Sequence, residues 1–251
     1  MYLTINDVEL HYEKQGIKGE SIILLHGWGQ NTTMMQPIAD HLETSYQIYN
    51  IDLPGFGKSS EPPVVWGVEE YVELLHSFTK QLNIDNPLII AHSFGARIAL
   101  LYASKYPVSK MVITGGAGIR PKRGFGYYYR VYSYKIMKMI LSLPGLSNYK
   151  KQMQEKAGSE DYKNTSGVMR ASFVKIVNLD LTNILSTINT ETLLVWGEND
   201  DATPLWMGQK MEALMPNAGL AVFENDGHYA YWHQMNRFLR VIDIFLESER
   251  N

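Results

Sequence analysis

Residues 88–96 read LIIAHSFGA, and this short stretch predicts a buried strand that turns abruptly into a helix. An apolar run without alternation is typical of a parallel strand that is covered on both faces. Ser93 stands between two small residues, with Ala91 two positions before it and Gly95 two positions after it. The stretch therefore predicts a strand that leads into a helix through a serine flanked by small residues.

Compact apolar runs of the same kind recur along the chain, with helical patterns between them. The runs cover residues 22–25, 48–51, 88–91, 111–114, 193–196 and 220–223. The helical patterns cover residues 69–82, 94–106, 205–215 and 231–247. Before them, Tyr2 to Glu13 alternates around Asn6-Asp7, as a β-hairpin does. We therefore predict an α/β fold with a mostly parallel central sheet of about eight strands and helices on both faces.

Residues 119–189 break this alternation, because they hold helical patterns and no strand that fits the sheet. One apolar stripe at spacings of three and four is formed by Tyr128, Val131, Tyr132, Ile136, Met139, Ile140 and Leu143. Open α/β sheets bind ligands at their carboxyl edge, so we predict that 119–189 is a helical cap over that edge. Residues 1–118 and 190–251 then form the core. A peripheral helical decoration or a dimerisation arm is the alternative.

Motifs that carry chemical groups follow several of the predicted strands. Residues 26–29 read HGWG, residues 197–204 read GENDDATP, and Gly227-His228 follows the last strand. Together with the serine turn, these motifs resemble those of the α/β-hydrolase family, whose serine motif is usually written G-x-S-x-G. Ala91 replaces the first glycine of that motif. The order serine, aspartate, histidine along the chain is the order of this family rather than of other serine enzymes.

The resemblance implies a catalytic triad of Ser93, Asp200 and His228. His228 is then the general base that takes the proton from Ser93, and the aspartate three residues after Gly197 orients the imidazole. That spacing selects Asp200. Asp201 is the competing candidate, and one acid of an adjacent pair at a helix start often serves only as a cap.

The same resemblance implies supporting roles for two further loops. Carried over, the backbone N–H groups of Trp28 and Phe94 form an oxyanion hole, which stabilises charge that appears only in the transition state. We expect the ring of His26 to tie down its loop rather than to react. Residues 52–59 read DLPGFGKS and resemble a tight family turn, so we assign them to scaffolding.

The implied chemistry is acyl transfer in two steps, without a metal or an organic cofactor. Ser93 attacks a carbonyl, and water then releases the acid from an acyl-enzyme. We therefore expect a carboxylesterase-like serine hydrolase that acts on small or medium-sized esters. A C–C bond hydrolase, a thioesterase or an acyltransferase can use the same triad, and a ligand receptor with vestigial turnover is a further alternative.

The composition of the predicted cap indicates candidate residues for the substrate pocket. Tyr128, Tyr132 and Met139 are candidate pocket residues, because aromatic and methionine side chains form broad apolar pockets. Residues 119–156 hold nine lysines and arginines against one glutamate, whereas the whole chain has a net charge of −3. One hypothesis is that this charge attracts anionic substrates. A solvated helix face or contact with an anionic membrane surface is the alternative.

Several classes of protein are disfavoured by composition. The chain has no cysteine, which excludes disulfides, thiolate nucleophiles and Cys-ligated metals. Its negative charge argues against nucleic acid as a partner. No run of about 18 apolar residues predicts stable insertion into a bilayer. The first twenty residues carry four acids and lack the basic head of a secretory signal, so we predict a cytoplasmic protein.

Overall fold

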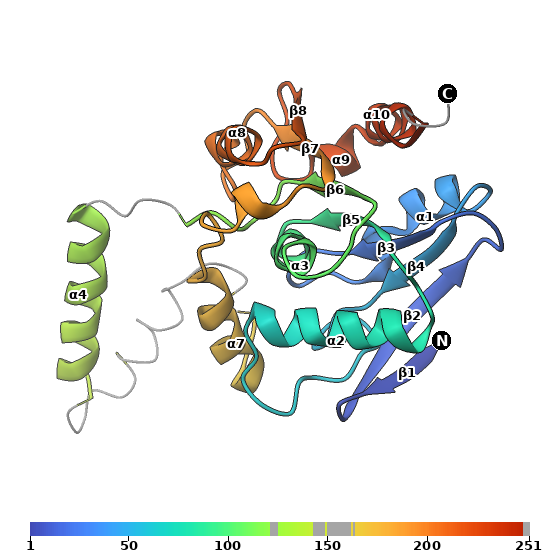
Figure 1. The fold of residues 1–251 in the computed structure, drawn as a ribbon. Coiled ribbons are helices and arrows are strands. Elements are labelled where there is room, and N and C mark those ends of the chain that lie inside the picture. The colour runs from blue at the N-terminus through green and yellow to red at the C-terminus, as the bar shows by residue number, and fades with distance from the viewer. Residues whose placement is uncertain (121–124, 143–148, 150–161, 163, 248–251) are drawn as a thin grey trace.

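One eight-stranded sheet organises the computed structural model, which describes residues 1–120, 125–142, 149, 162 and 164–247 (Figure 1). The strands are β1 (Tyr2–Ile5), β2 (Val8–Gln15), β3 (Ser21–Leu25), β4 (Gln47–Ile51), β5 (Leu88–His92), β6 (Lys110–Thr114), β7 (Glu191–Gly197) and β8 (Ala218–Phe223). Their order is β1-β2-β4-β3-β5-β6-β7-β8. β1 and β2 are antiparallel to their neighbours, and the strands from β4 to β8 pair in parallel. The predicted fold class is confirmed.

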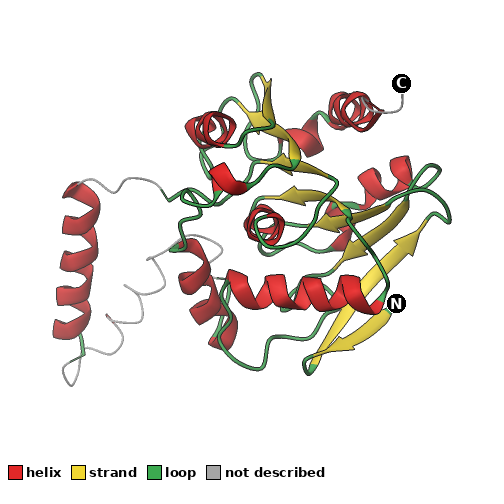
Figure 2. Cartoon of the chain, in the orientation of Figure 1, coloured by secondary structure: helices red, strands yellow, loops and turns green. Residues whose placement is uncertain are grey.

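Helices cover both faces of this sheet (Figure 2). They are α1 (Gln36–Leu42), α2 (Val68–Gln81), α3 (Phe94–Ala103), α4 (Phe125–Ile140), α7 (Gly167–Val177), α8 (Leu205–Leu214), α9 (Ala230–His233) and α10 (Met235–Glu247), with short 3-10 turns at Thr32–Met34 and Leu185–Thr187. Successive residues of β3 serve opposite faces, because strand side chains alternate. Ile23 and Leu25 join the core under α2, α3 and α8, and Ile22 and Leu24 join the core under α1, α9 and α10.

The predicted elements near the two ends of the chain have different outcomes. The hairpin turn is confirmed, with Asn6 and Asp7 at φ angles of 49° and 64°. These are the positive values that a two-residue hairpin turn requires. The prediction of one continuous helix over 231–247 is wrong, because Gln234 leaves the helical region at φ −108° and ψ 43° and separates α9 from α10.

The segment 119–189 lies between β6 and β7, and its two described helices differ in packing. On α7, Met169 and Ile176 are buried, and the Oγ of Ser172 accepts a 2.9 Å hydrogen bond from Trp66 N–H. α4 stands apart from the sheet in Figure 1, and its Tyr132 is 60% exposed. The predicted α4 helix is confirmed, but the described side chains of its apolar stripe face outward. Among the described helices, none combines the length and apolar composition needed to cross a bilayer.

The close approach of α3 to β3 makes Gly95 a sensitive position. A Cβ atom there would lie 2.5 Å from the carbonyl oxygen of Leu25 and 2.9 Å from that of His26. We expect Gly95→Ala to lower the free energy of unfolding by about 2 kcal/mol or more, because backbone cannot shift cheaply in a packed core. Urea unfolding followed by circular dichroism measures this change.

Gly126→Ala on α4 is the matched control, since a Cβ atom there meets nothing within 4 Å. It should leave the stability unchanged or raise it by up to about 1 kcal/mol, because alanine favours a helix interior. Equal stability of the two variants would contradict the close approach of α3 to β3.

Candidate active site

Ser93 occupies the strained turn between β5 and α3. Its φ is 50° and its ψ is −105°, a conformation that costs a residue with a side chain roughly 1–3 kcal/mol. Three backbone hydrogen bonds hold it there. Ser93 N–H donates to Thr114 O at 3.1 Å, and its carbonyl accepts from the N–H groups of Ala96 and Ala117 at 3.2 and 3.1 Å. The predicted turn is therefore present, with the serine at the carboxyl end of β5.

The three residues predicted as a triad meet at the carboxyl ends of β5, β7 and β8. The Nε2 atom of His228 lies 2.9 Å from Ser93 Oγ, and its Nδ1 atom lies 2.8 Å from Asp200 Oδ2. Asp200 is buried, whereas Asp201 is exposed. The carboxylate that reaches the imidazole is therefore that of Asp200. This arrangement allows a proton to pass from the serine hydroxyl to an imidazole whose other nitrogen is held by an acid.

Thr203 supports the aspartate and was not singled out by the sequence. Oδ1 of Asp200 accepts hydrogen bonds from the N–H groups of Ala202 and Thr203 at 2.9 and 2.8 Å. The Oγ1 atom of Thr203 lies 2.8 Å from Asp200 Oδ2, 3.0 Å from Gly115 O and 3.3 Å from His228 Nδ1. Its single proton can serve one of these acceptors at a time. The turn after Asp200 thus holds the carboxylate in the position where it meets His228.

His92 places a second imidazole beside the first. Its ring is fully buried, its centroid is 4.8 Å from that of His228, and its Nδ1 lies 3.0 Å from Thr114 O. Burial, and next the nearby charge of His228, hold the pKa of His92 well below its usual value. The ring is therefore neutral near pH 7, so Nδ1 carries the proton and donates it to the carbonyl.

The loop that carries Trp28 is fixed by His26, as expected from the sequence. The Nε2 atom of His26 accepts a 3.0 Å hydrogen bond from Leu53 N–H, and its Nδ1 lies 2.7 Å from Gly27 O. Burial lowers the pKa of His26 to about 4, against the hydrogen bond to Gly27, which raises it. The neutral ring therefore joins the loop after β3 to the loop after β4.

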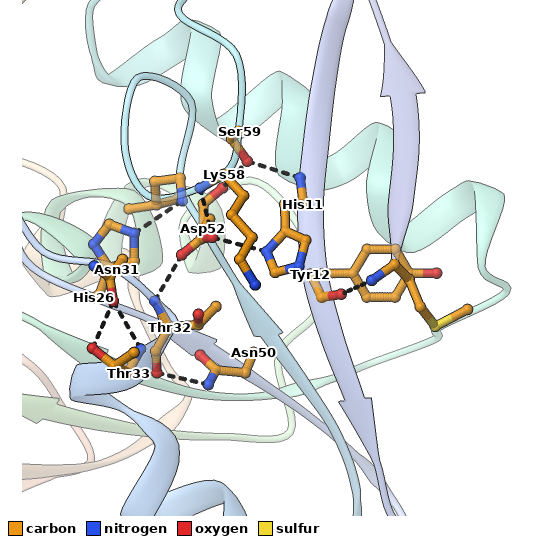
Figure 3. Close-up of polar contacts among 12 residues, drawn as sticks. His11, Tyr12, His26, Asn31, Thr32, Thr33, Asn50, Asp52, Lys58 and Ser59 are labelled. Carbon is orange, nitrogen blue, oxygen red and sulfur yellow. Dashed lines mark hydrogen bonds and ion pairs between the residues drawn. The ribbon is translucent and has the colours of Figure 1, made fainter.

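Asp52 is the centre of the polar network in Figure 3, and its expected scaffolding role is confirmed. Its carboxylate accepts hydrogen bonds from Thr32 N–H at 2.7 Å, Lys58 N–H at 2.9 Å and His11 Nδ1 at 2.8 Å. Burial alone would raise the pKa of Asp52, but these hydrogen bonds lower it overall. Ser59 Oγ donates to the carbonyl of Asp52 and accepts from His11 N–H. The network ties the 52–59 turn to β2 at His11 and to the 3-10 turn at Thr32.

A cavity of about 460 Å³ opens beside Ser93 and His228. Trp28 and Phe94, the predicted sources of the oxyanion-hole N–H groups, both line it. The N–H of Phe94 is the first of α3 and so has no partner within the helix. Phe173 of α7 also lines the cavity, with its ring centroid 5.0 Å from that of Trp28. The segment 119–189 thus contributes a wall to this cavity.

The predicted pocket residues lie elsewhere on the described chain. Tyr132 and Met139 are 60% and 70% exposed on α4 and are not among the residues that line the cavity. The side chain of Tyr128 lies outside the described residues. A role of these three in substrate binding stays a prediction. A lining residue that the sequence analysis missed is Arg97, which is buried on α3.

The chain is similar to known proteins along most of its length. Residues 20–234 match the family model described as alpha/beta hydrolase fold. The chain is 27% identical to the 2-hydroxy-6-oxononadienedioate/2-hydroxy-6-oxononatrienedioate hydrolase of Burkholderia vietnamiensis, over 96% of this chain and 91% of that protein. It is 26% identical to the 2-hydroxy-6-oxo-6-phenylhexa-2,4-dienoate hydrolase of Comamonas testosteroni, over 97% and 93%. The meta-cleavage product hydrolase from Pseudomonas fluorescens has the same fold, with a TM-score of 0.75, 22% identity and coverage of 99% and 98%.

The neutral, buried His26 predicts a loss of stability in mild acid. Its folded-state pKa of about 4 lies below the ordinary 6.5, so between these values the unfolded chain binds a proton that the folded chain excludes. The stabilisation present above pH 6.5 is therefore lost as the pH falls towards 4, by roughly 2 kcal/mol at pH 5. The free energy of unfolding in urea at pH 7 and pH 5 measures it.

His26→Gln keeps an acceptor for the N–H of Leu53 but cannot be protonated. The difference in stability between pH 7 and pH 5 should therefore shrink in this variant. His41→Gln is the control, since His41 lies at the surface beside Asp243. If His26→Gln and His41→Gln show the same pH dependence as the unsubstituted chain, the buried imidazole is not its source.

Proposed function

The chain belongs to the alpha/beta hydrolase fold family, and we propose that it is a serine hydrolase that cleaves a C–C bond next to a ketone. The observation that carries the proposal is the hydrogen-bonded line from Ser93 Oγ through His228 to Asp200 beside an open cavity. These three residues are the proposed catalytic residues. The backbone N–H groups of Trp28 and Phe94 are the proposed oxyanion hole.

The reaction begins at the ketone carbonyl of the substrate. His228 Nε2 takes the proton of Ser93 as Oγ forms a bond to the carbonyl carbon, and the charge moves to the carbonyl oxygen. Preorganised N–H donors at that oxygen are each worth on the order of 3 kcal/mol in the transition state. Collapse of this adduct breaks the adjacent C–C bond, and the released carbon takes the electron pair and then the proton from the imidazolium of His228.

The second half of the reaction frees the serine. Water attacks the acyl group on Ser93, His228 takes a proton from the water, and the Ser93–acyl bond breaks to release a carboxylic acid. Asp200 keeps the imidazole in the orientation needed for both proton transfers. The sum is addition of one water molecule across one C–C bond, with no change in the enzyme.

The choice of a C–C bond rests on the relatives rather than on the triad. The two curated relatives reported above act on compounds named as 6-oxo dienoates and dienedioates, and the chain covers more than nine tenths of each. A carbon leaving group departs only when its electron pair is delocalised. A substrate in which the broken bond is conjugated with a second unsaturated group meets that need.

Hydrolysis of carboxylic esters, the function expected from the sequence, is the second candidate. The same hydrogen-bonded relay favours it, because an imidazolium at His228 can also protonate a departing alkoxide. Attack, acyl-enzyme and water release are shared by the two reactions. Only the leaving group differs, so the two candidates are separated by substrate and not by the catalytic residues.

Substitution of the triad tests the proposed roles directly. We expect Ser93→Ala to lower kcat by roughly 10³- to 10⁶-fold and Asp200→Asn by about 10⁴-fold, with the fold retained by circular dichroism. Asp201→Asn is the matched control, because it removes the adjacent exposed acid, and it should stay within about tenfold of the unsubstituted chain. A folded Ser93→Ala protein with undiminished turnover would end the proposal.

A pair of substrates separates the two candidates for the cleaved bond. We expect kcat/KM for 2-hydroxy-6-oxo-6-phenylhexa-2,4-dienoate to exceed that for 4-nitrophenyl butyrate by at least about tenfold. Loss of the dienoate absorbance and release of benzoate report the first reaction, and release of nitrophenolate reports the second. Ester turnover without any dienoate cleavage would instead support the ester candidate.

A further inference from the structure

Arg97 places a buried cation in the wall of the cavity beside Ser93. It lies on the first turn of α3, four residues after Ser93, and it is among the residues that line the cavity. The whole residue is only 7% exposed. Arg97 is therefore a buried residue in the wall of the cavity and not a surface arginine.

Among the described residues, one N–H donor of Arg97 has a hydrogen-bond partner. Nη1 donates to the carbonyl of Leu179 at 2.8 Å. Within the described part of the chain this is its one hydrogen-bond partner, and no carboxylate lies within ion-pair distance of it. A guanidinium offers five N–H donors in a planar fork. Burial of a cation with so few partners costs free energy unless an anion completes the site.

The charge of Arg97 persists at neutral pH. Burial lowers its pKa to about 10, and Asp180 opposes that shift. Asp180 is engaged elsewhere, since its Oδ1 accepts hydrogen bonds from Thr182 N–H at 3.0 Å and from Thr182 Oγ1 at 2.6 Å. Asp201, an exposed acid, is the other charged residue among those that line the cavity. Arg97 is thus a protonated, buried side chain on a residue that lines the cavity.

We propose that Arg97 binds a carboxylate group of the substrate and so selects carboxylate-bearing ketones or esters. A carboxylate fits the planar fork of a guanidinium through two parallel hydrogen bonds. The assignment rests on the proposed function, because it requires that the cavity beside Ser93 receives the substrate. It gives Arg97 a role in specificity.

A structural role is the competing explanation for Arg97, since its bond to Leu179 joins α3 to the segment after α7. Loss of such a structural hydrogen bond would weaken the binding of charged and neutral ligands alike. A carboxylate-binding group would affect charged ligands far more than neutral ones. The comparison of two ligands that differ only in charge therefore separates the explanations.

Binding to the Ser93→Ala protein tests the proposal without any turnover. The probes are 4-oxo-4-phenylbutanoate and its carboxamide, which share a phenyl ketone and differ in the terminal charge. Isothermal titration calorimetry gives both Kd values at one fixed ionic strength. We expect the acid to bind at least about tenfold more tightly than the amide, as one charge-assisted bidentate contact allows. If the amide binds as tightly as the acid, the proposal is overturned before any change to Arg97.

Variants at position 97 then locate the source of the preference. In the Ser93→Ala background, Arg97→Gln keeps a donor for the Leu179 carbonyl but removes the charge, and it should abolish the preference for the acid. Arg97→Lys keeps the charge without the fork and should restore part of it. Arg240→Met is the matched control for net charge, since Arg240 is exposed on α10, and it should retain the full preference.

The outcomes separate this proposal from the proposed function. An unchanged ratio of the two Kd values in Arg97→Gln would contradict carboxylate binding by Arg97. Equal weakening of both ligands would assign Arg97 to the structural role alone. Failure of the enzyme to cleave any dienoate, with the preference for the acid intact and dependent on Arg97, would refute the C–C bond assignment and leave the carboxylate site standing.

Discussion

The backbone conformation of Ser93 is the constraint on which the rest of the site depends. A positive φ at a residue with a side chain is unfavourable by roughly 1–3 kcal/mol, so the surrounding structure has to impose it. The hydrogen bond to Thr114 fixes the turn from β6, and the close contact of Gly95 with the Leu25 carbonyl fixes it from β3. Both strands neighbour β5 in the centre of the sheet, so the strained residue is held from both sides by central strands.

The turn at Ser93 places its Oγ atom at the carboxyl edge of the sheet. Loops that follow other strands reach it there. His228 follows β8 and Asp200 follows β7, so their meeting depends on the parallel order of β5 to β8. The supporting groups are mainly neutral or fully hydrogen-bonded. His26 and His92 are neutral through burial, which leaves His228 as the imidazole beside Ser93 that can accept its proton. The proton shared by Ser93 and His228 is thus surrounded by imidazoles that stay neutral.

Much of this arrangement could be predicted from the sequence, because uninterrupted apolar runs identify central parallel strands and small residues around Ser93 identify the turn. Other features lack such a signal. α1 has seven residues, too few to show a helical period. At the break between α9 and α10, the side chain of Gln234 donates to Glu224 O and Asp226 Oδ2, and such contacts exist only in the folded chain. Arg97 lies in an apolar helical pattern, and sequence alone does not say whether such an arginine is buried. Thr203 lies three residues after Asp200 in the sequence. Its hydrogen bonds to the carboxylate depend on the geometry of the turn, which the sequence does not show.

In the proposed mechanism, the cavity allows one hydrogen-bonded relay to serve different bonds. The proposed attack needs the carbonyl carbon at Ser93 Oγ, but the leaving group is determined by which end of the substrate points towards His228. Apolar walls such as Phe173 and Ile176 hold a ligand without orienting it, because the hydrophobic effect has no direction. A guanidinium at one position does have direction, since a carboxylate fits its fork in few orientations. The distance between Arg97 and Ser93 along α3 would then determine which carbonyl of a substrate is attacked, and the triad itself would not need to distinguish a carbon from an oxygen leaving group.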